Sequence, residues 1–454
     1  MAAGDINGDG TDDLIIGAKY ATPAGGTSAG ETYVIYGGDS LPATIDLDST
    51  SAGLTVYGDD ANGWMGDSVA AGDINGDGVD DLIIGADRAD APGGDGAGET
   101  YVIYGGDSLP ATIDLDSTSA GLTVYGDDAW NSSGWAVAAG DINGDGTDDL
   151  IIGAYTADAP GGSQAGKTYV IYGGDSLPAT IDLDSTSADL TVYGDDAFDD
   201  SGWSVAAGDI NGDGTDDLII GARSADPAGR SIAGETYLIY GGDSLPATID
   251  LDSTSAGLTV YGDELWDVSG SSVAVGDFDG DGTDDLIIGA PSAGLAGGSR
   301  FGATYVIYGG DSLPATIDLD TTSAGVTVYS DARENAGQSV AAGDIDGDGA
   351  DDLIMSAFWA SPAGRYGAGE TYVIYGGPRP LPTPTPAPTP TPTLTPTPTP
   401  TALAAVQLPD TGSEPGGQAG SMADGWPAAL AAVAIAAGAV ALAAGGWYAR
   451  RRLR

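Results

Sequence analysis

The stretch Asp141-Ile142-Asn143-Gly144-Asp145-Gly146-Thr147-Asp148-Asp149, followed at once by Leu150-Ile151-Ile152-Gly153-Ala154, decides the fold of this chain. It places oxygen-bearing side chains at positions 1, 3, 5 and 9 and a glycine at position 6. Hard cations such as Ca²⁺ need several oxygens converging at about 2.3–2.6 Å, and glycine permits the sharp turn between them. The run occurs six times, so it marks a repeat; its copies begin at Asp5, Asp73, Asp141, Asp209, Asp277 and Asp344.

The run differs from an EF-hand loop. Position 12 is Ile152, where an EF-hand needs a bidentate glutamate. The flanking segments 137–139 and 150–152 are short and apolar, which favours buried strands over helices. We therefore predict a calcium-binding turn that joins two strands. The alternative is that Asp, Asn and Gly merely form good turns, but a turn needs only two or three such residues.

The predicted calcium ligands are the side chains at positions 1, 3, 5 and 9 and the backbone carbonyl at position 7. Position 8 is predicted not to bind the metal. The predicted sites are Asp5, Asn7, Asp9, Thr11 and Asp13; Asp73, Asn75, Asp77, Val79 and Asp81; Asp141, Asn143, Asp145, Thr147 and Asp149; Asp209, Asn211, Asp213, Thr215 and Asp217; Asp277, Asp279, Asp281, Thr283 and Asp285; and Asp344, Asp346, Asp348, Ala350 and Asp352.

Composition narrows the classes of function. The formal net charge is −55, which disfavours nucleic acid as a partner because no basic patch is available for phosphates. The chain has no histidine and no cysteine, so the usual general base, zinc ligand and thiol nucleophile are missing. Catalysis by carboxylates alone stays possible, but no Asp/Glu pair stands apart from the repeat. We therefore expect that the chain is not an enzyme and has no catalytic residues.

Residues 1–377 consist of one unit repeated at intervals of 68 or 67 residues. The second unit predicts four strands, at 68–72 (A), 82–86 (B), 99–106 (C) and 122–126 (D). Four strands per tandem unit are typical of a β-propeller blade, so we predict an all-β propeller of six or seven blades. A solenoid is the alternative architecture.

Several of these motifs resemble the FG-GAP repeat of integrin α-chain propellers. They are Gly202-Trp203-Ser204-Val205-Ala206, the metal loop, and Gly289-Ala290-Pro291 in the fifth unit. The resemblance implies an integrin α-like propeller with calcium in its loops. The chain departs from the family where Met65, Ser133, Ser201, Ser269 and Ala336 replace the Phe of the "FG" pair, so the resemblance does not extend to integrin ligand specificity.

Comparison among the units separates fixed from variable connections. The C–D connection, such as residues 105–116, recurs almost unchanged, whereas the B–C and D–A connections vary. In an antiparallel meander the A–B and C–D turns lie on one face, and the B–C and D–A turns lie on the other. We expect the variable, aromatic-bearing loops to be a binding face, with neutral drift as the alternative. Their aromatic residues include Trp64, Trp130, Phe198 and Trp266.

The two ends of the repeat region are irregular. Met1 aligns with Val69, inside strand A, and the sixth unit ends after strand C at Gly377. Because a closed propeller usually completes a blade with a terminal strand, we expect an N-terminal truncation with a missing export signal.

The remaining sequence predicts a surface anchor. Residues 378–407 form a Pro/Thr-rich stalk, 408–412 read Leu-Pro-Asp-Thr-Gly, 413–426 form a polar spacer, 427–448 predict a transmembrane helix, and 449–454 form a basic cytoplasmic tail. The last three features resemble an LPxTG sorting signal, which implies a sortase that cuts between Thr411 and Gly412. We thus expect an extracellular, surface-anchored adhesion or ligand-binding module whose ligand is a protein or a glycan. The alternatives are a carbohydrate-binding propeller or the binding domain of a larger secreted enzyme.

Overall fold

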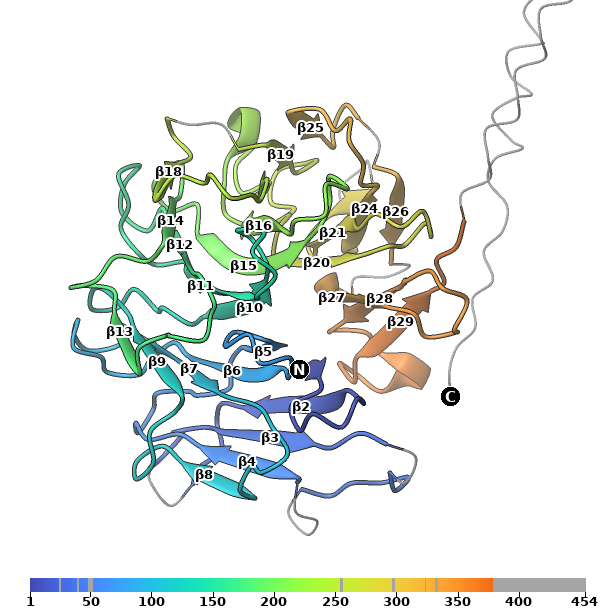
Figure 1. Cartoon of the computed structure of the whole chain (residues 1–454). Helices are drawn as coiled ribbons and strands as arrows, with labels where there is room; N and C mark the ends of the chain where they lie inside the picture. The colour runs from blue at the N-terminus through green and yellow to red at the C-terminus, as the bar shows by residue number, and fades with distance from the viewer. Residues whose placement is uncertain are drawn as a thin grey trace, which may run out of the picture. The chain divides into compact units, whose positions relative to one another are not determined.

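The computed structural model describes residues 1–378, apart from 24–25, 39–40, 48–51, 254–255, 296–298, 323 and 331–333. These residues belong to one compact unit, Met1–Arg379. It is an all-β propeller of six blades, and each blade begins with the strand that precedes one acidic loop. The propeller prediction is confirmed, and the solenoid alternative is wrong. Figure 1 shows the six sheets following one another from blue to orange, with β5, β10, β15, β20 and β27 toward the centre.

The strand bounds follow the predicted repeat closely. In blade order they are β1 Ala2–Gly4, β2 Asp13–Ala18, β3 Glu31–Ile35 and β4 Leu54–Tyr57; β5 Val69–Gly72, β6 Asp81–Ala86, β7 Glu99–Ile103 and β9 Leu122–Tyr125; β10 Ala136–Gly140, β11 Asp149–Ala154, β12 Lys167–Ile171 and β14 Leu190–Tyr193; β15 Ser201–Gly208, β16 Asp217–Ala222, β17 Glu235–Ile239 and β19 Leu258–Tyr261; β20 Ser272–Gly276, β21 Asp285–Ala290, β24 Ala303–Ile307 and β26 Val326–Tyr329; and β27 Ala336–Gly343, β28 Asp352–Ala357 and β29 Glu370–Ile374.

Short elements complete the described part of the chain. Four three-residue strands lie in C–D connections, one pair of two-residue strands forms a small hairpin in a B–C connection, and two three-residue 3-10 helices lie in B–C connections. They are β8 Thr112–Asp114, β13 Thr180–Asp182, β18 Thr248–Asp250 and β25 Thr316–Asp318, the two-residue pair β22 Gly294–Leu295 and β23 Ser299–Arg300, and η1 Pro227–Gly229 and η2 Pro362–Gly364. None of the described helices is long and apolar enough to cross a membrane. The predicted transmembrane helix, stalk and sorting motif lie outside the described residues.

The second strand of each blade is apolar on both faces. In the third blade β11 pairs antiparallel with β10 and β12, with Val137 opposite Ile152 and Ile152 opposite Tyr169. All six residues of β11 are buried, because neighbouring blades cover the two faces of the sheet. A strand buried on both sides reads as a continuous apolar run rather than an alternating one, which is how it appears in the sequence.

The hydrophobic core lies between consecutive blades. Five clusters join the five neighbouring pairs; in one of them Ile210 and Ile219 of the fourth blade pack with Leu286 and Ile288 of the fifth. The innermost strands approach so closely that a Cβ on Gly72 would lie 2.4 Å from Ala139 Cβ, so only glycine fits there. Leu14 of the first blade and Ile345 of the sixth are 43% and 55% exposed. The residues at the same two repeat positions in the other blades are buried at the five contacts between neighbouring blades.

Each of the first four blades has a fifth strand that the four-strand prediction missed. Thr112–Asp114 of the second repeat pairs in parallel with β4 of the first blade, with Ile113 opposite Val56. The same exchange occurs from the third to the second blade, from the fourth to the third and from the fifth to the fourth. The nearly invariant C–D connection therefore adds a strand to the outer edge of the preceding blade. Among the described residues, the fifth sheet has four strands and the sixth has three, without a strand D.

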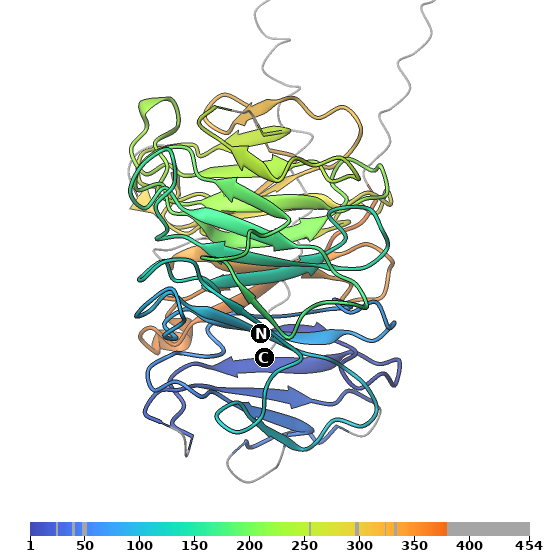
Figure 2. The ribbon, with the colours of Figure 1, turned by 60° about the vertical axis from the view of Figure 1, so that its left-hand side comes forward.

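The loops divide between two faces as predicted. On one face, the acidic loop of the first repeat accepts a hydrogen bond at Ile6 O from Gly106 N, at the start of the next C–D connection (2.9 Å). On the other, the D–A residue Trp130 donates its N–H to the B–C residue Asp95 O (3.1 Å). Figure 2 shows the strands crossing between two groups of loops. Metal loops and variable loops thus lie at opposite ends of the strands.

Candidate metal centres

Each acidic loop folds around the carboxylate at position 1. In the third repeat, Asp141 Oδ1 accepts hydrogen bonds from Gly144 N and Asp145 N (2.8 and 2.9 Å), and Oδ2 accepts one from Gly146 N (2.8 Å). Gly144 and Gly146 have φ values of 77° and 90°, a conformation that glycine adopts without strain. The loop is therefore preformed by its own backbone, with position 1 at its centre.

The carboxylate at position 9 fixes the loop to the blade. Asp149 is fully buried; its Oδ2 accepts hydrogen bonds from Ile142 N and Asn143 N (3.0 and 3.1 Å). Its Oδ1 accepts from Asn143 Nδ2 and from Gly173 N at the end of strand C (3.0 and 2.9 Å). Burial, partly opposed by these backbone donors and assisted by the charges of Asp141 and Asp145, raises the pKa of Asp149 to about 7. A nearby cation would offset this cost of keeping the carboxylate charged.

In each of the last two loops, the structure brings three of the four predicted side chains together. Ligand atoms of Asp277, Asp279 and Asp285 lie within 4.8 Å of one another, as do those of Asp344, Asp346 and Asp352. In these loops position 3 is Asp, whereas the first four loops have Asn there. Hard carboxylate oxygens are the ligands that Ca²⁺ takes, so the donor set fits this ion. The position 5 carboxylate lies outside both groups; in the third loop Asp145 Oδ1 accepts a hydrogen bond from Thr147 N (3.0 Å).

Position 8 has a role that the sequence did not reveal. Asp80 Oδ2 accepts a hydrogen bond from Asp5 N of the preceding repeat at 2.9 Å. The same bond recurs at the next four contacts between blades, from Asp73, Asp141, Asp209 and Asp277 to Asp148, Asp216, Asp284 and Asp351. The position 8 carboxylate is therefore a link between neighbouring loops. The regular recurrence of Asp at this position was the only signal in the sequence.

The opposite face carries exposed aromatic side chains in a strained backbone conformation. Trp130, Phe198 and Trp266 have φ values of 66°, 71° and 69° and are 63%, 60% and 45% exposed. The first repeat has Asn62 at the equivalent position, with φ 65°, and asparagine tolerates this region far better than a bulky aromatic residue. Three exposed rings at strained positions suggest a function other than stability.

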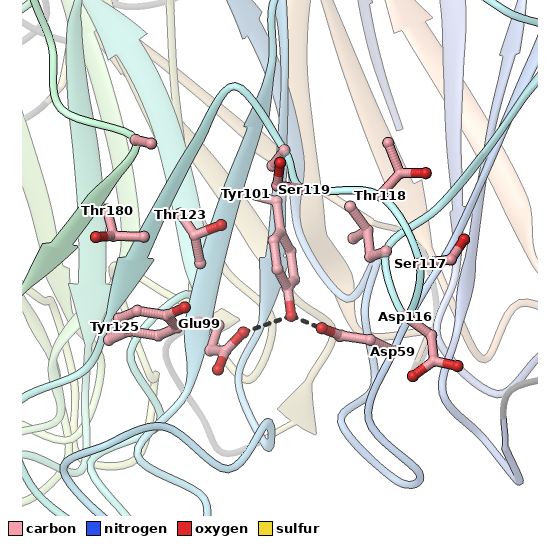
Figure 3. Close-up of a pocket in the computed structure, with 13 residues that line it drawn as sticks. Asp59, Glu99, Tyr101, Asp116, Ser117, Thr118, Ser119, Thr123, Tyr125 and Thr180 are labelled. Carbon is pink, nitrogen blue, oxygen red and sulfur yellow. Dashed lines mark hydrogen bonds between the residues drawn. The ribbon is translucent and has the colours of Figure 1, made fainter.

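A pocket of about 330 Å³ lies at the rim between the first two blades, lined by hydroxyls and carboxylates. Figure 3 shows the Tyr101 hydroxyl between Glu99 and Asp59, to which it is joined at 2.5 and 2.8 Å. Burial, opposed by the hydrogen bond from Tyr101 and assisted by the charges of Asp59, Asp60 and Asp90, raises the pKa of Glu99 to about 8. In the third repeat Lys167 replaces this glutamate, and its Nζ lies 2.5 Å from Asp127, the equivalent of Asp59.

The fold and these loops define a class of protein, a propeller whose blades each carry an acidic A–B loop. The FG-GAP repeat family matches residues 1–35, 65–103, 133–171, 201–239, 269–307 and 336–374, and the chain belongs to this family.

Three similar proteins illustrate its relationships. The chain is 28% identical over 368 residues to phosphatidylinositol-glycan-specific phospholipase D of Bos taurus, covering 79% of this chain and 42% of that protein. It is 32% identical over 228 residues to integrin alpha pat-2 of Caenorhabditis elegans, covering 49% of this chain and 17% of the integrin. A solved structure, the rhamnogalacturonan lyase PL11 of Bacillus licheniformis, aligns with 82% of this chain and 59% of its own at 12% identity and a TM-score of 0.30.

The comparison corrects one expectation. We predicted that the chain is not an enzyme, and this prediction is contradicted because the similar proteins include an enzyme, phosphatidylinositol-glycan-specific phospholipase D. The chain lacks histidine and cysteine, which are two common kinds of catalytic residue. Their absence is nevertheless compatible with sequence similarity to an enzyme. The chain spans less than half the length of the two curated relatives named above.

Proposed function

We propose that this chain is a calcium-binding propeller, anchored at the cell surface, that acts as an adhesion or ligand-binding module. The observation that carries the proposal is the division of the loops between two faces. Six preformed acidic loops lie on one face, and the variable loops with exposed aromatic residues lie on the other. A rigid scaffold with variable loops at one end is a common arrangement for binding.

Calcium would stabilise the scaffold and would not contact the bound ligand. The ion would be held by positions 1, 3, 5 and 9 of each loop and by the position 7 carbonyl, and it would neutralise carboxylates that repel one another. The position 8 carboxylate would then couple neighbouring loops: ordering of one loop by calcium would help to order the next through the hydrogen bond from Asp73 N to Asp148. The predicted result is a stiffer ring of blades when calcium is present.

The proposed location is extracellular. The integrin among the relatives and the predicted anchor of the C-terminal sequence both support it. The anchor would be either the helix at 427–448 or a sortase-made link at Thr411. The partners would be an extracellular protein or glycan and, through the helix, the membrane.

Adherence of whole cells tests the proposal. Cells that express the chain and cells that lack it would be compared for retention on ligand-coated surfaces, in calcium, in EDTA, and after calcium is restored. We expect adherence that depends on the chain, falls in EDTA and returns with calcium. Propeller peptides should also be released by protease from intact cells, while a cytoplasmic control protein stays protected. Equal adherence of the two strains, or a protected propeller, would contradict the proposal.

A second candidate is that the propeller is the binding domain of a larger enzyme. The 28% identity to phosphatidylinositol-glycan-specific phospholipase D over 79% of this chain favours it. Release of a phosphatidylinositol-glycan-anchored reporter by the natural gene product would support this candidate, and the absence of release would leave the adhesion module as the better account.

A further inference from the structure

Side chains of the variable face form one continuous strip across the first four blades. The strip consists of the rings of Tyr20, Trp64, Trp135, Tyr155 and Trp203 and of the cations Lys19, Arg88 and Arg223. Its residues lie just after strand B or close to the start of strand A, and Trp203 is inside strand A of the fourth blade (β15). The residue directly after strand B differs in every repeat, although strand B itself is nearly constant: Lys19, Asp87, Tyr155, Arg223, Pro291 and Phe358.

The rings of the strip contact one another and the cations. Trp135, Tyr155 and Trp203 form a triangle with centroid distances of 4.4 to 4.8 Å. Lys19 Nζ lies 5.4 Å from the Trp64 ring and 5.8 Å from the Trp135 ring, and so joins this triangle to the first two blades.

The strip ends at Arg223, and its rings are accessible from solvent. Arg223 lies over Trp203, with its Cζ 3.0 Å from the ring centroid. Trp64, Trp135, Tyr155 and Trp203 are half-buried, and Tyr20 is 64% exposed. A bound molecule can therefore reach the rings without unfolding the loops.

Each cation of the strip has a carboxylate beside it. Lys19 pairs with Asp67 at 2.6 Å, Arg223 with Asp200 at 3.4 Å, and Arg88 Nε lies 3.8 Å from Asp87. Three cations and three carboxylates leave the strip close to neutral in a chain whose formal charge is −55. The strip thus offers hydrogen-bond donors and acceptors side by side, with little net charge.

Asp87 is a buried acceptor that the described residues do not satisfy. It is 1% exposed, and neither carboxylate oxygen has a hydrogen-bond donor in the part of the chain that the structure describes. Buried polar groups nearly always have a partner in proteins, so a donor from water is expected at this point. Asp87 lies directly beside Arg88 of the strip.

We propose that this strip is a binding site for a neutral glycan. Aromatic faces stack on the apolar faces of sugar rings, and paired cations and carboxylates match hydroxyls, which both donate and accept hydrogen bonds. An acidic polysaccharide would meet no free positive charge on the strip and would be repelled by the rest of the chain. This inference rests on the proposed function, since it names the ligand class of the same binding face.

The test uses the full-length chain, with calcium held constant, on an array of neutral, uronate-bearing and sulfated oligosaccharides. Affinity is then measured for the best neutral oligosaccharide with the wild type, Tyr20→Ala and Tyr366→Ala. Tyr366 is a matched control because it is 91% exposed in a B–C connection of the sixth blade and is not one of the strip's residues. We expect neutral oligosaccharides to bind, to quench tryptophan fluorescence, and to bind Tyr20→Ala about tenfold more weakly. Binding by Tyr366→Ala should stay within about twofold of the wild type.

Three results would overturn the inference: no binding of neutral oligosaccharides, binding confined to acidic oligosaccharides or to protein ligands, or equal losses in the two variants. The melting temperature of the same preparations with and without calcium separates this inference from the proposed function. If calcium raises the melting temperature and no neutral glycan binds, the glycan inference alone fails. If a neutral glycan binds with the expected variant pattern and calcium has no effect, the calcium scaffold fails and the glycan site stands.

Discussion

The Asp148 carboxylate accepts a hydrogen bond from the backbone N–H of Asp73, at 2.9 Å, and so joins the acidic loop of the third repeat to that of the second. Both residues belong to loops proposed to bind calcium, but only Asp73 is a predicted ligand. Because the same bond recurs at five contacts between blades, the acidic loops form a connected series along the ring.

This bond predicts a ranking of two variants that reverses with calcium. Without calcium, Asp148→Ala loses the inter-blade bond and should lower the free energy of unfolding by about 1–2 kcal/mol. Asp145→Ala loses only a bond within an exposed turn and should cost less. With saturating calcium, Asp145→Ala loses a ligand and becomes the more harmful change. Denaturant unfolding of both variants, in EDTA and in calcium, measures the two rankings; the same ranking in both conditions would contradict the ligand assignment.

The exchanged outer strand makes a separate prediction, with a control inside the chain. Ile181→Ala removes a buried side chain from β13, which pairs with β9 of the preceding blade, and should cost about 2–4 kcal/mol. Ile45 has the same sequence neighbours, but among the described residues it belongs to no strand and is only half-buried. Ile45→Ala should therefore cost under about 1 kcal/mol. Thermal melts of the two variants measure the difference, and equal losses would show that the exchanged strand does not stabilise the ring.

The strained aromatic residues predict a gain in stability on substitution. Phe198 has φ 71° and is 60% exposed, whereas the equivalent Asn62 of the first repeat adopts φ 65°. Phe198→Asn should raise the free energy of unfolding by about 0.5–1 kcal/mol, because asparagine tolerates this backbone conformation better. Ala228, also at positive φ, gives a control through Ala228→Gly, which should stabilise without removing an exposed ring. A loss of stability in Phe198→Asn would mean that the ring packs favourably on the face.

Glu99 predicts a dependence of stability on pH. Burial raises its pKa from 4.5 to about 8, so between these values the folded protein binds more protons than the unfolded chain. Stability from this group is therefore greatest below about pH 4.5 and is lost as the pH rises toward about 8. Glu99→Gln should match the wild type near pH 5 and exceed it at pH 8.5 by about 1–3 kcal/mol. Unfolding curves at the two pH values test this, with Glu370→Gln, at a more exposed equivalent position, as the control; a constant difference between Glu99→Gln and the wild type would contradict it.

The sequence predicted the blades because their signals are local. An acidic loop with glycine at fixed positions, followed by Leu150-Ile151-Ile152, specifies a turn and a doubly buried strand without reference to the rest of the fold. The division of the loops between two faces followed from the antiparallel order of strands A to D alone, because successive turns in such a meander lie at alternate ends of the strands. The bounds of β6 and β7, Asp81–Ala86 and Glu99–Ile103, differ from the prediction by three residues or fewer.

The contacts between repeats could not be predicted from one repeat. Residues 44–46 and 112–114 both read Thr-Ile-Asp, but the latter form a strand because β4 of the preceding blade lies beside them. The role of Asp148 likewise depends on a partner in another blade. The strip on the variable face was predicted only in part, because its members are single residues that contact one another across four blades.

Calcium titration of the full-length chain, by calorimetry and with the melting temperature as a second readout, tests the central claim most directly. We expect several sites with dissociation constants of about 10⁻⁴–10⁻³ M, and a rise in melting temperature that EDTA reverses and Mg²⁺ at equal concentration does not reproduce. A flat titration, with a melting temperature unchanged by either calcium or EDTA, would contradict the account.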